Sequence, residues 1–163
     1  MQQTGAMPAE PILSPAERSF LFAERRAILA TVGAEGLPRL VPVCFVVADT
    51  DDKLGRPRIY SPIDEKTKAS PDPHKLARVR DLLILPAATL LVDRWDEDWT
   101  RLGWLRLYGR AELLEPQPHE VKEHGWAVAA LRAKYEQYAS HQLEGRPIIR
   151  ITADRSVSWG RLD

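Results

Sequence analysis

Residues 58–82 read RIYSPIDEKTKASPDPHKLARVRDL, and this stretch decides how the rest of the chain is interpreted. It opens as a predicted strand whose apolar pattern stops at Pro62. A loop that carries Lys66 and Lys68 follows, and a predicted helix closes the stretch. Two lysines that leave a strand just ahead of a helix are suited to holding a phosphate by charge and hydrogen bonds. A solvated basic loop would have the same composition, so both interpretations stay open.

The helix within this stretch has a recognisable start. Asp72 offers a side-chain oxygen for an N-cap, and Pro73 suits the first helical position because its missing N–H would have no partner there. Leu76, Val79 and Leu83 are spaced for one apolar face. The sequence therefore predicts a helix that begins at Pro73 and packs through these three residues.

The whole chain has 163 residues, of which 44% are apolar, and this fits one domain with a buried core. Lys and Arg together number 23, as do Asp and Glu, which argues against binding to nucleic acid or to an anionic membrane. No apolar run is long enough to span a membrane, no signal-peptide pattern is present, and Cys44 has no second cysteine to pair with. These features predict a cytoplasmic protein with a loose tail at residues 1–13 and one domain at 14–163.

The first half of the domain predicts a helix followed by a hairpin. The capping-box sequence SPAE at residues 14–17 indicates a helix over 15–24. Two apolar runs around a Glu-Gly turn predict strands over 27–33 and 39–49. Pro42 cannot donate to a strand ladder, so it belongs at a sheet edge or bulge, or at a place where unpaired backbone groups face a ligand.

The second half predicts strands over 87–94 and 102–114, a helical region over 116–139, and strands over 147–153 and 156–159. The strand over 102–114 has an apolar face and a basic, aromatic face; the second face is either solvated or lines an anionic or aromatic ligand, and it comprises Trp104, Arg106, Tyr108 and Arg110. The helical region has one apolar face with the residues Val121, Val128, Leu131, Tyr135 and Tyr138. Because strands and helices do not alternate regularly, a small antiparallel barrel with flanking helices fits best.

Several motifs of catalytic or metal-binding proteins are absent from the sequence. There is no glycine-rich nucleotide loop of the Rossmann or P-loop type and no nucleophile elbow, so we assign no catalytic residue. His119 and His124 resemble a zinc-binding helix, but a spacing of five residues places them on different helix faces. We therefore predict no metal site.

The order of ILATVG, PRLVPV, IYSPIDEKTK, ATLLVDRWDEDW and LRLYGRAELL resembles the split β-barrel flavin-binding family, the superfamily of pyridoxamine 5′-phosphate oxidase. Within this superfamily the chain looks most like the branch that uses the deazaflavin coenzyme F420. The resemblance covers residues 14–160 and implies a mainly β fold, a small antiparallel split β-barrel with flanking helices.

By position, the resemblance also implies a cofactor site. Lys66 and Lys68 match the basic pair on the cofactor phosphate. The end of the neighbouring strand matches the segment whose backbone runs beside the phosphate and ring system, and it comprises Ser61, Pro62 and Ile63. Pro42 and Val43 match the strand along the ring edge. The insertion at residues 70–74 leaves open whether Arg78 or Arg80 reaches the cofactor.

Members of the family are homodimers with sites at the interface, so the segment from Trp99 to Trp104 is expected to cover the ring bound by the other subunit. Together with Trp95, these residues form an aromatic cluster that one hairpin turn does not easily bury, and such clusters favour interfaces. The alternative is that the three tryptophans close one end of their own barrel.

The resemblance implies an oxidoreductase that uses coenzyme F420 to reduce an unsaturated small molecule. FMN as the cofactor, or a carrier that binds a flavin without turnover, are the alternatives. Coenzyme F420 has a polyglutamate tail, which would benefit from basic surface at Arg56, Lys75 and Arg78.

Overall fold

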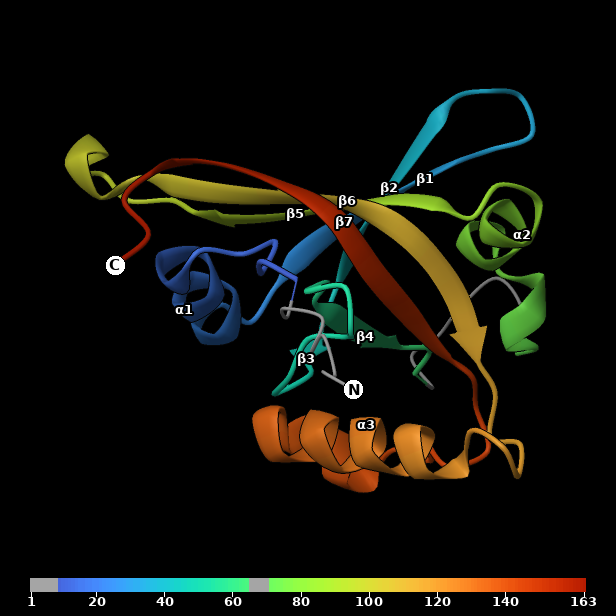
Figure 1. Cartoon of the computed structure of the whole chain (residues 1–163). Coiled ribbons are helices and arrows are strands. Elements are labelled where there is room, and N and C mark those ends of the chain that lie inside the picture. Colours follow the sequence, from blue (N-terminus) through green and yellow to red (C-terminus); the bar gives the residue numbers. More distant parts are fainter. Residues whose placement is uncertain (1–8, 65–70) are drawn as a thin grey trace, which may run out of the picture.

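A computed structural model of the protein describes residues 9–64 and 71–163. Within these residues one antiparallel sheet of seven strands has the order β2-β1-β5-β6-β7-β4-β3 (Figure 1). The strands are β1 (Ala27–Val32), β2 (Pro38–Val43), β3 (Val46–Val47), β4 (Arg58–Pro62), β5 (Ala87–Arg94), β6 (Gly103–Leu114) and β7 (Ile148–Gly160). The α-helices are α1 (Pro15–Ala23), α2 (Ala77–Ile84) and α3 (Val121–Lys134). The mainly β architecture of a split barrel with flanking helices is confirmed.

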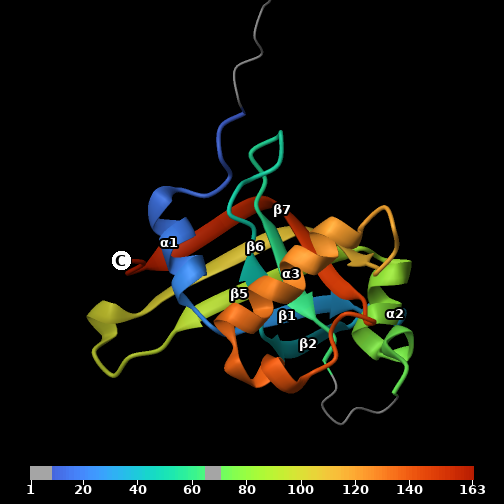
Figure 2. The same ribbon diagram turned by 90° about the horizontal axis from the view of Figure 1, so that it is seen from below.

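The sheet curls, and its long strands β6 and β7 arc over a core that the helices cover (Figure 1). One core cluster contains α1, α2 and the inner face of β1, β5 and β6. A second cluster is formed by α3 with the segment from β3 to β4. Seen from below, α3 crosses in front of the sheet (Figure 2). None of the helices in the described part of the chain is long and apolar enough to cross a membrane.

The start of α1 follows the sequence closely. The Ser14 hydroxyl accepts the backbone N–H of Glu17 at 3.2 Å, and the Glu17 carboxylate accepts the N–H of Ser14 at 2.9 Å. This reciprocal pair satisfies two donors that a helix start leaves without partners. Phe20 and Leu21 then point into the core.

The hairpin of β1 and β2 is present, and Pro42 lies opposite Ile28 on β2, an edge strand of the sheet. The edge position expected for a residue without a backbone N–H is thereby confirmed. The prediction of a single strand over 39–49 was wrong, however, because the strand is interrupted at Cys44 and Phe45, between β2 and β3. The hydroxyl of Tyr135 bonds both backbone groups of Phe45 and so takes them out of any strand ladder.

The region of α2 also differs from expectation. Asp72 does accept the N–H of His74 as an N-cap, but only a 3₁₀ turn (Pro73–Lys75) follows. Leu76 is extended, which lets its side chain reach the core, and α2 begins after it. Leu83 is 64% exposed, and Leu82 takes the buried position instead, so the predicted apolar face was wrong by one residue.

The C-terminal elements correct two further predictions. The two strands expected over 147–153 and 156–159 are one strand, β7, in which Asp154 forms a bulge opposite the step from Tyr108 to Gly109. The helical region consists of α3 and a 3₁₀ segment (Glu136–Ser140). Its apolar face is confirmed except for Val121, which is 56% exposed at the first turn of α3.

Candidate functional site

The end of β4 holds three of the residues assigned to the cofactor. Ser61 is 1% exposed and lies opposite Ile149 of β7, and Pro62 lies opposite Ile148. The carbonyl oxygen of Ile63 accepts a hydrogen bond of 2.8 Å from Nε of Arg146. Lys66 and Lys68, the proposed phosphate ligands, lie outside the residues that the structure describes.

The end of β2 leads back to β4. After Val43 the chain kinks and enters β3, whose Val46 pairs with Tyr60 of β4. Val43 is buried and belongs to the same core cluster as Ile63. Pro42 is exposed and shares the outer face of the sheet with Ile28. The structure therefore places Val43 inward and Pro42 outward.

A buried polar cluster lies where the kink after β2 meets the end of β4. The Tyr138 hydroxyl donates to Oδ2 of Asp64 at 3.2 Å, and the Cys44 thiol also approaches this hydroxyl. Burial, with smaller contributions from Cys44 and Asp64, raises the pKa of Tyr138, so its hydroxyl stays protonated and acts as a donor. Sequence reasoning assigned Tyr138 only to the apolar face of a helix.

Two hydrogen-bond donors near this cluster are buried without a partner among the described residues. They are the hydroxyl of Ser61 and Nε of Arg78. Burial lowers the pKa of Arg78, and the nearby charge of Asp64 opposes this shift. A buried donor without an acceptor is costly. The position of these two donors, before and after the segment 65–70, fits a ligand rich in acceptors, such as a phosphorylated cofactor.

Tyr135 fixes the backbone next to this site, which the sequence did not indicate. Its hydroxyl accepts the N–H of Phe45 at 3.0 Å and lies 2.8 Å from the carbonyl oxygens of Arg25 and Phe45. Burial raises the pKa of Tyr135 to about 12. Tyr135, the residue that follows α3, thus holds the kink after Val43.

The tryptophans lie far from the end of β4 within one chain. Trp95 and Trp99 are 69% and 73% exposed, so they do not close their own barrel. Trp104 is near one end of β6, whereas Leu114, which faces Ile148 and through it Pro62, is at the other. At about 3.3 Å per residue these ends are roughly 30 Å apart along the strand.

The outer face of the sheet carries a pocket of about 380 Å³ beside Trp104, lined also by Arg26, Ile28, Leu91, Asp93 and Arg106. The Arg106 guanidinium lies 5.2 Å from the ring centre of Trp104 and 5.4 Å from that of Tyr108. Its Nε is buried without a partner in the described structure. Arg110, by contrast, is exposed. The basic, aromatic face therefore divides into a pocket lining and a solvated part.

The two histidines of the zinc-like sequence have separate surroundings. Nε2 of His124 donates to the carbonyl oxygen of Arg146 at 2.7 Å, and this histidine is buried on α3. His119 is exposed. Residues 9–64 and 71–163 contain no group of three side chains placed to hold a metal ion.

The family model for pyridoxamine 5′-phosphate oxidase matches residues 13–160. The chain belongs to the pyridoxamine 5′-phosphate oxidase family. No curated protein sequence matches it.

Solved structures share the fold of this family member at low sequence identity. A conserved hypothetical protein from Mycobacterium tuberculosis is 22% identical, with 96% of this chain and 90% of that chain covered and a TM-score of 0.66. HutZ, the heme storage protein from Vibrio cholerae, is 15% identical, with 93% and 96% covered and a TM-score of 0.62. A FAD-binding protein from Mesorhizobium loti is 19% identical, with 90% and 94% covered and a TM-score of 0.60. At these identities the likeness concerns the fold alone.

In this member of the pyridoxamine 5′-phosphate oxidase family, the residues assigned to the cofactor form two groups. The first gathers Val43 and the end of β4 around buried donors. The second places Trp104 with Pro42's neighbour Ile28 on the outer face. The adjacent residues Pro42 and Val43 connect the two groups, but Trp104 and the end of β4 lie at opposite ends of the long strands within one chain.

Proposed function

We propose that this protein is an oxidoreductase that binds coenzyme F420 and transfers hydride to an unsaturated small molecule, at a site completed by a second copy of the chain. The observation that carries the proposal is a pair of buried donors, Ser61 Oγ and Arg78 Nε, that have no partner among residues 9–64 and 71–163. They flank the segment that contains Lys66 and Lys68 in the sequence. A phosphorylated flavin or deazaflavin supplies acceptors for such donors.

The bound cofactor would supply the hydride chemistry, so the protein's own residues bind, orient and exclude water. Lys66 and Lys68 would hold the phosphate, and Ser61 would donate to an acceptor of the cofactor. Tyr135 would keep the backbone after Val43 in place by its bonds to Phe45. No side chain is assigned a role as general acid or base.

The choice of coenzyme F420 over FMN depends on basic surface for the polyglutamate tail. Arg56 is held by Asp52 at 2.7 Å and lies 3.6 Å from Asp154, and Arg78 is half-buried, so neither is the exposed cation that the sequence suggested. Lys75 and Arg80 are exposed and are the better candidates. Fluorescence titration of the apoprotein with each cofactor distinguishes the two, and tight FMN binding without F420 binding would favour the alternative.

A carrier without turnover is the remaining alternative, because no acid, base or nucleophile is assigned at the site. Incubating the loaded protein with reduced cofactor and a panel of enones, quinones and tetrapyrroles tests it. Oxidation of the cofactor by any of these compounds supports an enzyme.

Replacing Lys68 with alanine should weaken cofactor binding roughly ten- to a hundredfold, because a charge-assisted hydrogen bond contributes on the order of 1.5–3 kcal/mol. Lys66→Ala should act in the same direction. Isothermal titration with the cofactor measures both. Lys53→Ala, an exposed lysine in the β3–β4 loop, is the matched control. If both site variants bind cofactor like the parent, the loop is simply solvated.

Ser61→Ala should leave the stability of the apoprotein unchanged or slightly higher, because the buried hydroxyl has no partner to lose among the residues that the structure describes. The same change should weaken cofactor binding about tenfold, the value of one hydrogen bond. Thermal melts and cofactor titrations measure the two effects. Thr31→Val is the control, since this buried hydroxyl donates to Asp81 at 2.8 Å and its loss should destabilise the protein by about 1–3 kcal/mol. A large loss of apoprotein stability in Ser61→Ala would contradict the assignment.

A further inference from the structure

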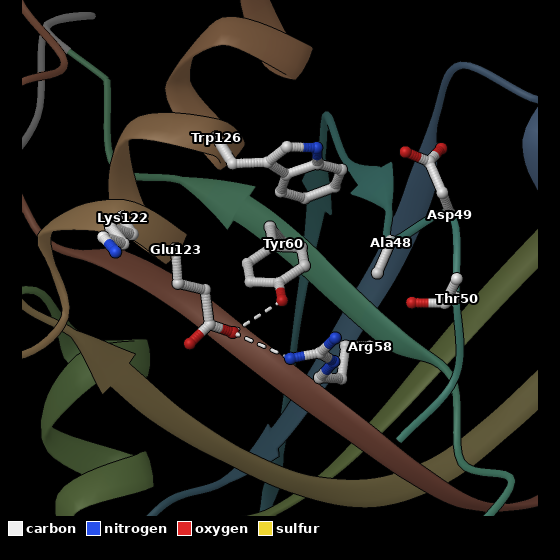
Figure 3. A pocket seen from close by; sticks show the side chains of 8 residues that line it. All are labelled: Ala48, Asp49, Thr50, Arg58, Tyr60, Lys122, Glu123 and Trp126. Atoms are coloured by element: carbon white, nitrogen blue, oxygen red, sulfur yellow. Dashed lines mark hydrogen bonds and ion pairs between the residues drawn. The ribbon is translucent and has the colours of Figure 1, made fainter. Parts of the chain in front are cut away.

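A second pocket, of about 340 Å³, lies between α3 and the first half of β4 (Figure 3). Its lining residues are Ala48, Asp49, Thr50, Arg58, Tyr60, Lys122, Glu123 and Trp126. None of them belongs to the residues assigned to the flavin-type cofactor. The pocket is therefore distinct from the residues of the proposed hydride-transfer site, although Tyr60 directly precedes Ser61 on β4.

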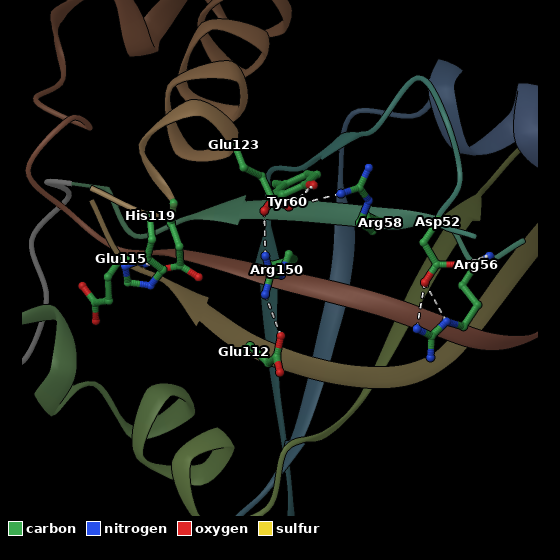
Figure 4. Close-up of polar contacts among 10 residues, drawn as sticks. Asp52, Arg56, Arg58, Tyr60, Glu112, Glu115, His119, Glu123 and Arg150 are labelled. Atoms are coloured by element: carbon green, nitrogen blue, oxygen red, sulfur yellow. Dashed lines mark hydrogen bonds and ion pairs between the residues drawn. The ribbon is translucent and has the colours of Figure 1, made fainter. Parts of the chain in front are cut away.

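The polar side of this pocket is fixed by a network around Glu123 (Figure 4). One carboxylate oxygen accepts the Tyr60 hydroxyl at 2.6 Å, and the other accepts Nη1 of Arg150 at 2.7 Å. Arg150 is also bound to Glu112 at 2.8 Å. Burial, and next the hydrogen bond to Glu123, raises the pKa of Tyr60, so its hydroxyl keeps its proton as a donor.

Arg58 is the exception in this network. Its guanidinium makes one ion-pair contact with Glu123, at 3.5 Å, and its side chain has no hydrogen bond to any residue that the structure describes. Its side chain is 33% exposed, so part of the guanidinium can be reached from the pocket. An arginine has five N–H donors in a planar fork that matches a carboxylate. Most of this capacity is unused in Arg58.

The remaining walls are apolar and aromatic. The rings of Trp126 and Tyr60 meet edge to face with centroids 5.2 Å apart, and Ala48 lies opposite (Figure 3). Lys122 adds a positive charge at the rim, and it has no ion pair among the described residues. Asp49 is exposed at the other lip and points away from Arg58 (Figure 3). The pocket therefore combines aromatic surface with a cationic rim.

We propose that this pocket binds a small aromatic carboxylate, with its ring against Trp126 and its carboxylate on the guanidinium of Arg58. The ring would bury apolar area against two aromatic side chains. The carboxylate would accept hydrogen bonds from the unused donors of Arg58. Arg150 and Tyr60 would continue to donate to the Glu123 carboxylate. A neutral ring of the same shape lacks the second interaction.

Titration with benzoate, followed by two-dimensional NMR of the labelled protein, tests the proposal. The indole N–H signal of Trp126 should shift with a Kd on the order of 0.1–1 mM, as expected for so small a ligand. Benzamide, the neutral analogue, should bind about tenfold more weakly or worse. Nuclear Overhauser contacts between the benzoate ring and the Trp126 indole should be seen in the unmodified protein.

Variants separate the role of Arg58 from a general charge effect. Arg58→Gln should weaken benzoate at least about tenfold and leave benzamide unchanged, because only the charged fork is removed. Arg56→Gln is the matched control, since Asp52 already holds that guanidinium, and benzoate affinity should not change. The contacts to Trp126 in the unmodified protein decide the matter should Arg58→Gln fail to fold.

Three results would overturn this inference. Equal affinities for benzoate and benzamide would remove the role of Arg58. Shifts that map to residues outside the α3–β4 pocket would place the ligand elsewhere. Loss of benzoate binding after saturation with coenzyme F420 or FMN would place benzoate in the cofactor site. The proposed oxidoreductase function would survive each of these results, because its own test is cofactor binding by Ser61 and Lys68 variants.

Discussion

Gly109→Ala is expected to destabilise the protein by about 3 kcal/mol or more, among the largest effects of a single substitution. A Cβ at Gly109 would lie 2.0 Å from the carbonyl oxygen of Thr152 and 2.8 Å from Cα of Ala153. Both atoms belong to the backbone of β7, so the clash cannot be relieved by a side-chain rotation. Urea unfolding followed by circular dichroism measures the loss.

The matched control is Gly125→Ala within α3. A Cβ at Gly125 would meet no other atom, and alanine is the better helix former, so this variant should gain up to about 1 kcal/mol. The same substitution should therefore lower the free energy of unfolding at Gly109 and raise it at Gly125. A Gly109→Ala variant with the stability of the parent would mean that β7 can move away at its bulge. This result would contradict the inference that β6 and β7 must lie this close together at Gly109.

The bulge at Gly109 also marks what the sequence could and could not predict about the fold. Local patterns located the strands well: β5 has the predicted bounds, and β6 differs by one residue at its start. The predicted break in β7 was a real signal, because Asp154 falls in the bulge between Ala153 and Arg155. Alternation alone could not tell a bulge from the end of a strand, since both interrupt the apolar pattern.

Long-range contacts account for the other errors. The kink after β2 exists because Tyr135, distant in the sequence, bonds the backbone of Phe45. Leu76 interrupts its helix because it turns into the core. The pairing of β1 with β5 and of β4 with β7 joins strands that are not neighbours in the chain. None of these features has a local sequence signal.

In the candidate site, too, the sequence indicated some residues and missed others. The family resemblance pointed to the end of β4, where the Ser61 hydroxyl is buried and has no partner in the described part of the chain. It left Arg78 open, and the structure places this side chain near Asp64. Tyr138 and Tyr135 had only an apolar helical spacing to indicate them, because a tyrosine that bonds with its hydroxyl and one that only packs look alike in a sequence.

Trp104→Glu is expected to abolish cofactor binding, with a loss of more than a hundredfold in affinity. We propose that the outer face around Trp104 covers the cofactor bound by a second copy of the chain. The change removes the aromatic cover and places a charge in a desolvated interface, which costs several kcal/mol even with Arg106 nearby, and Asp93 opposite Trp104 would add repulsion between like charges. Because Trp104 is only half-buried in one chain, the fold itself should tolerate the change. Fluorescence titration with the cofactor and a thermal melt of the apoprotein measure the two effects.

The dependence on protein concentration makes the prediction specific to a shared site. Diluting the parent protein below its dimer dissociation constant should release cofactor, whereas the Trp104→Glu variant should fail to bind it at any concentration. Leu54→Glu introduces the same charge at an exposed apolar residue of the β3–β4 loop, and its cofactor affinity should equal that of the parent. Within one chain, Trp104 and the end of β4 lie at opposite ends of the long strands, so Trp104 would not cover a ring bound at the end of β4 in its own chain. Sedimentation that finds a monomer with its cofactor still bound would therefore rule out a shared site.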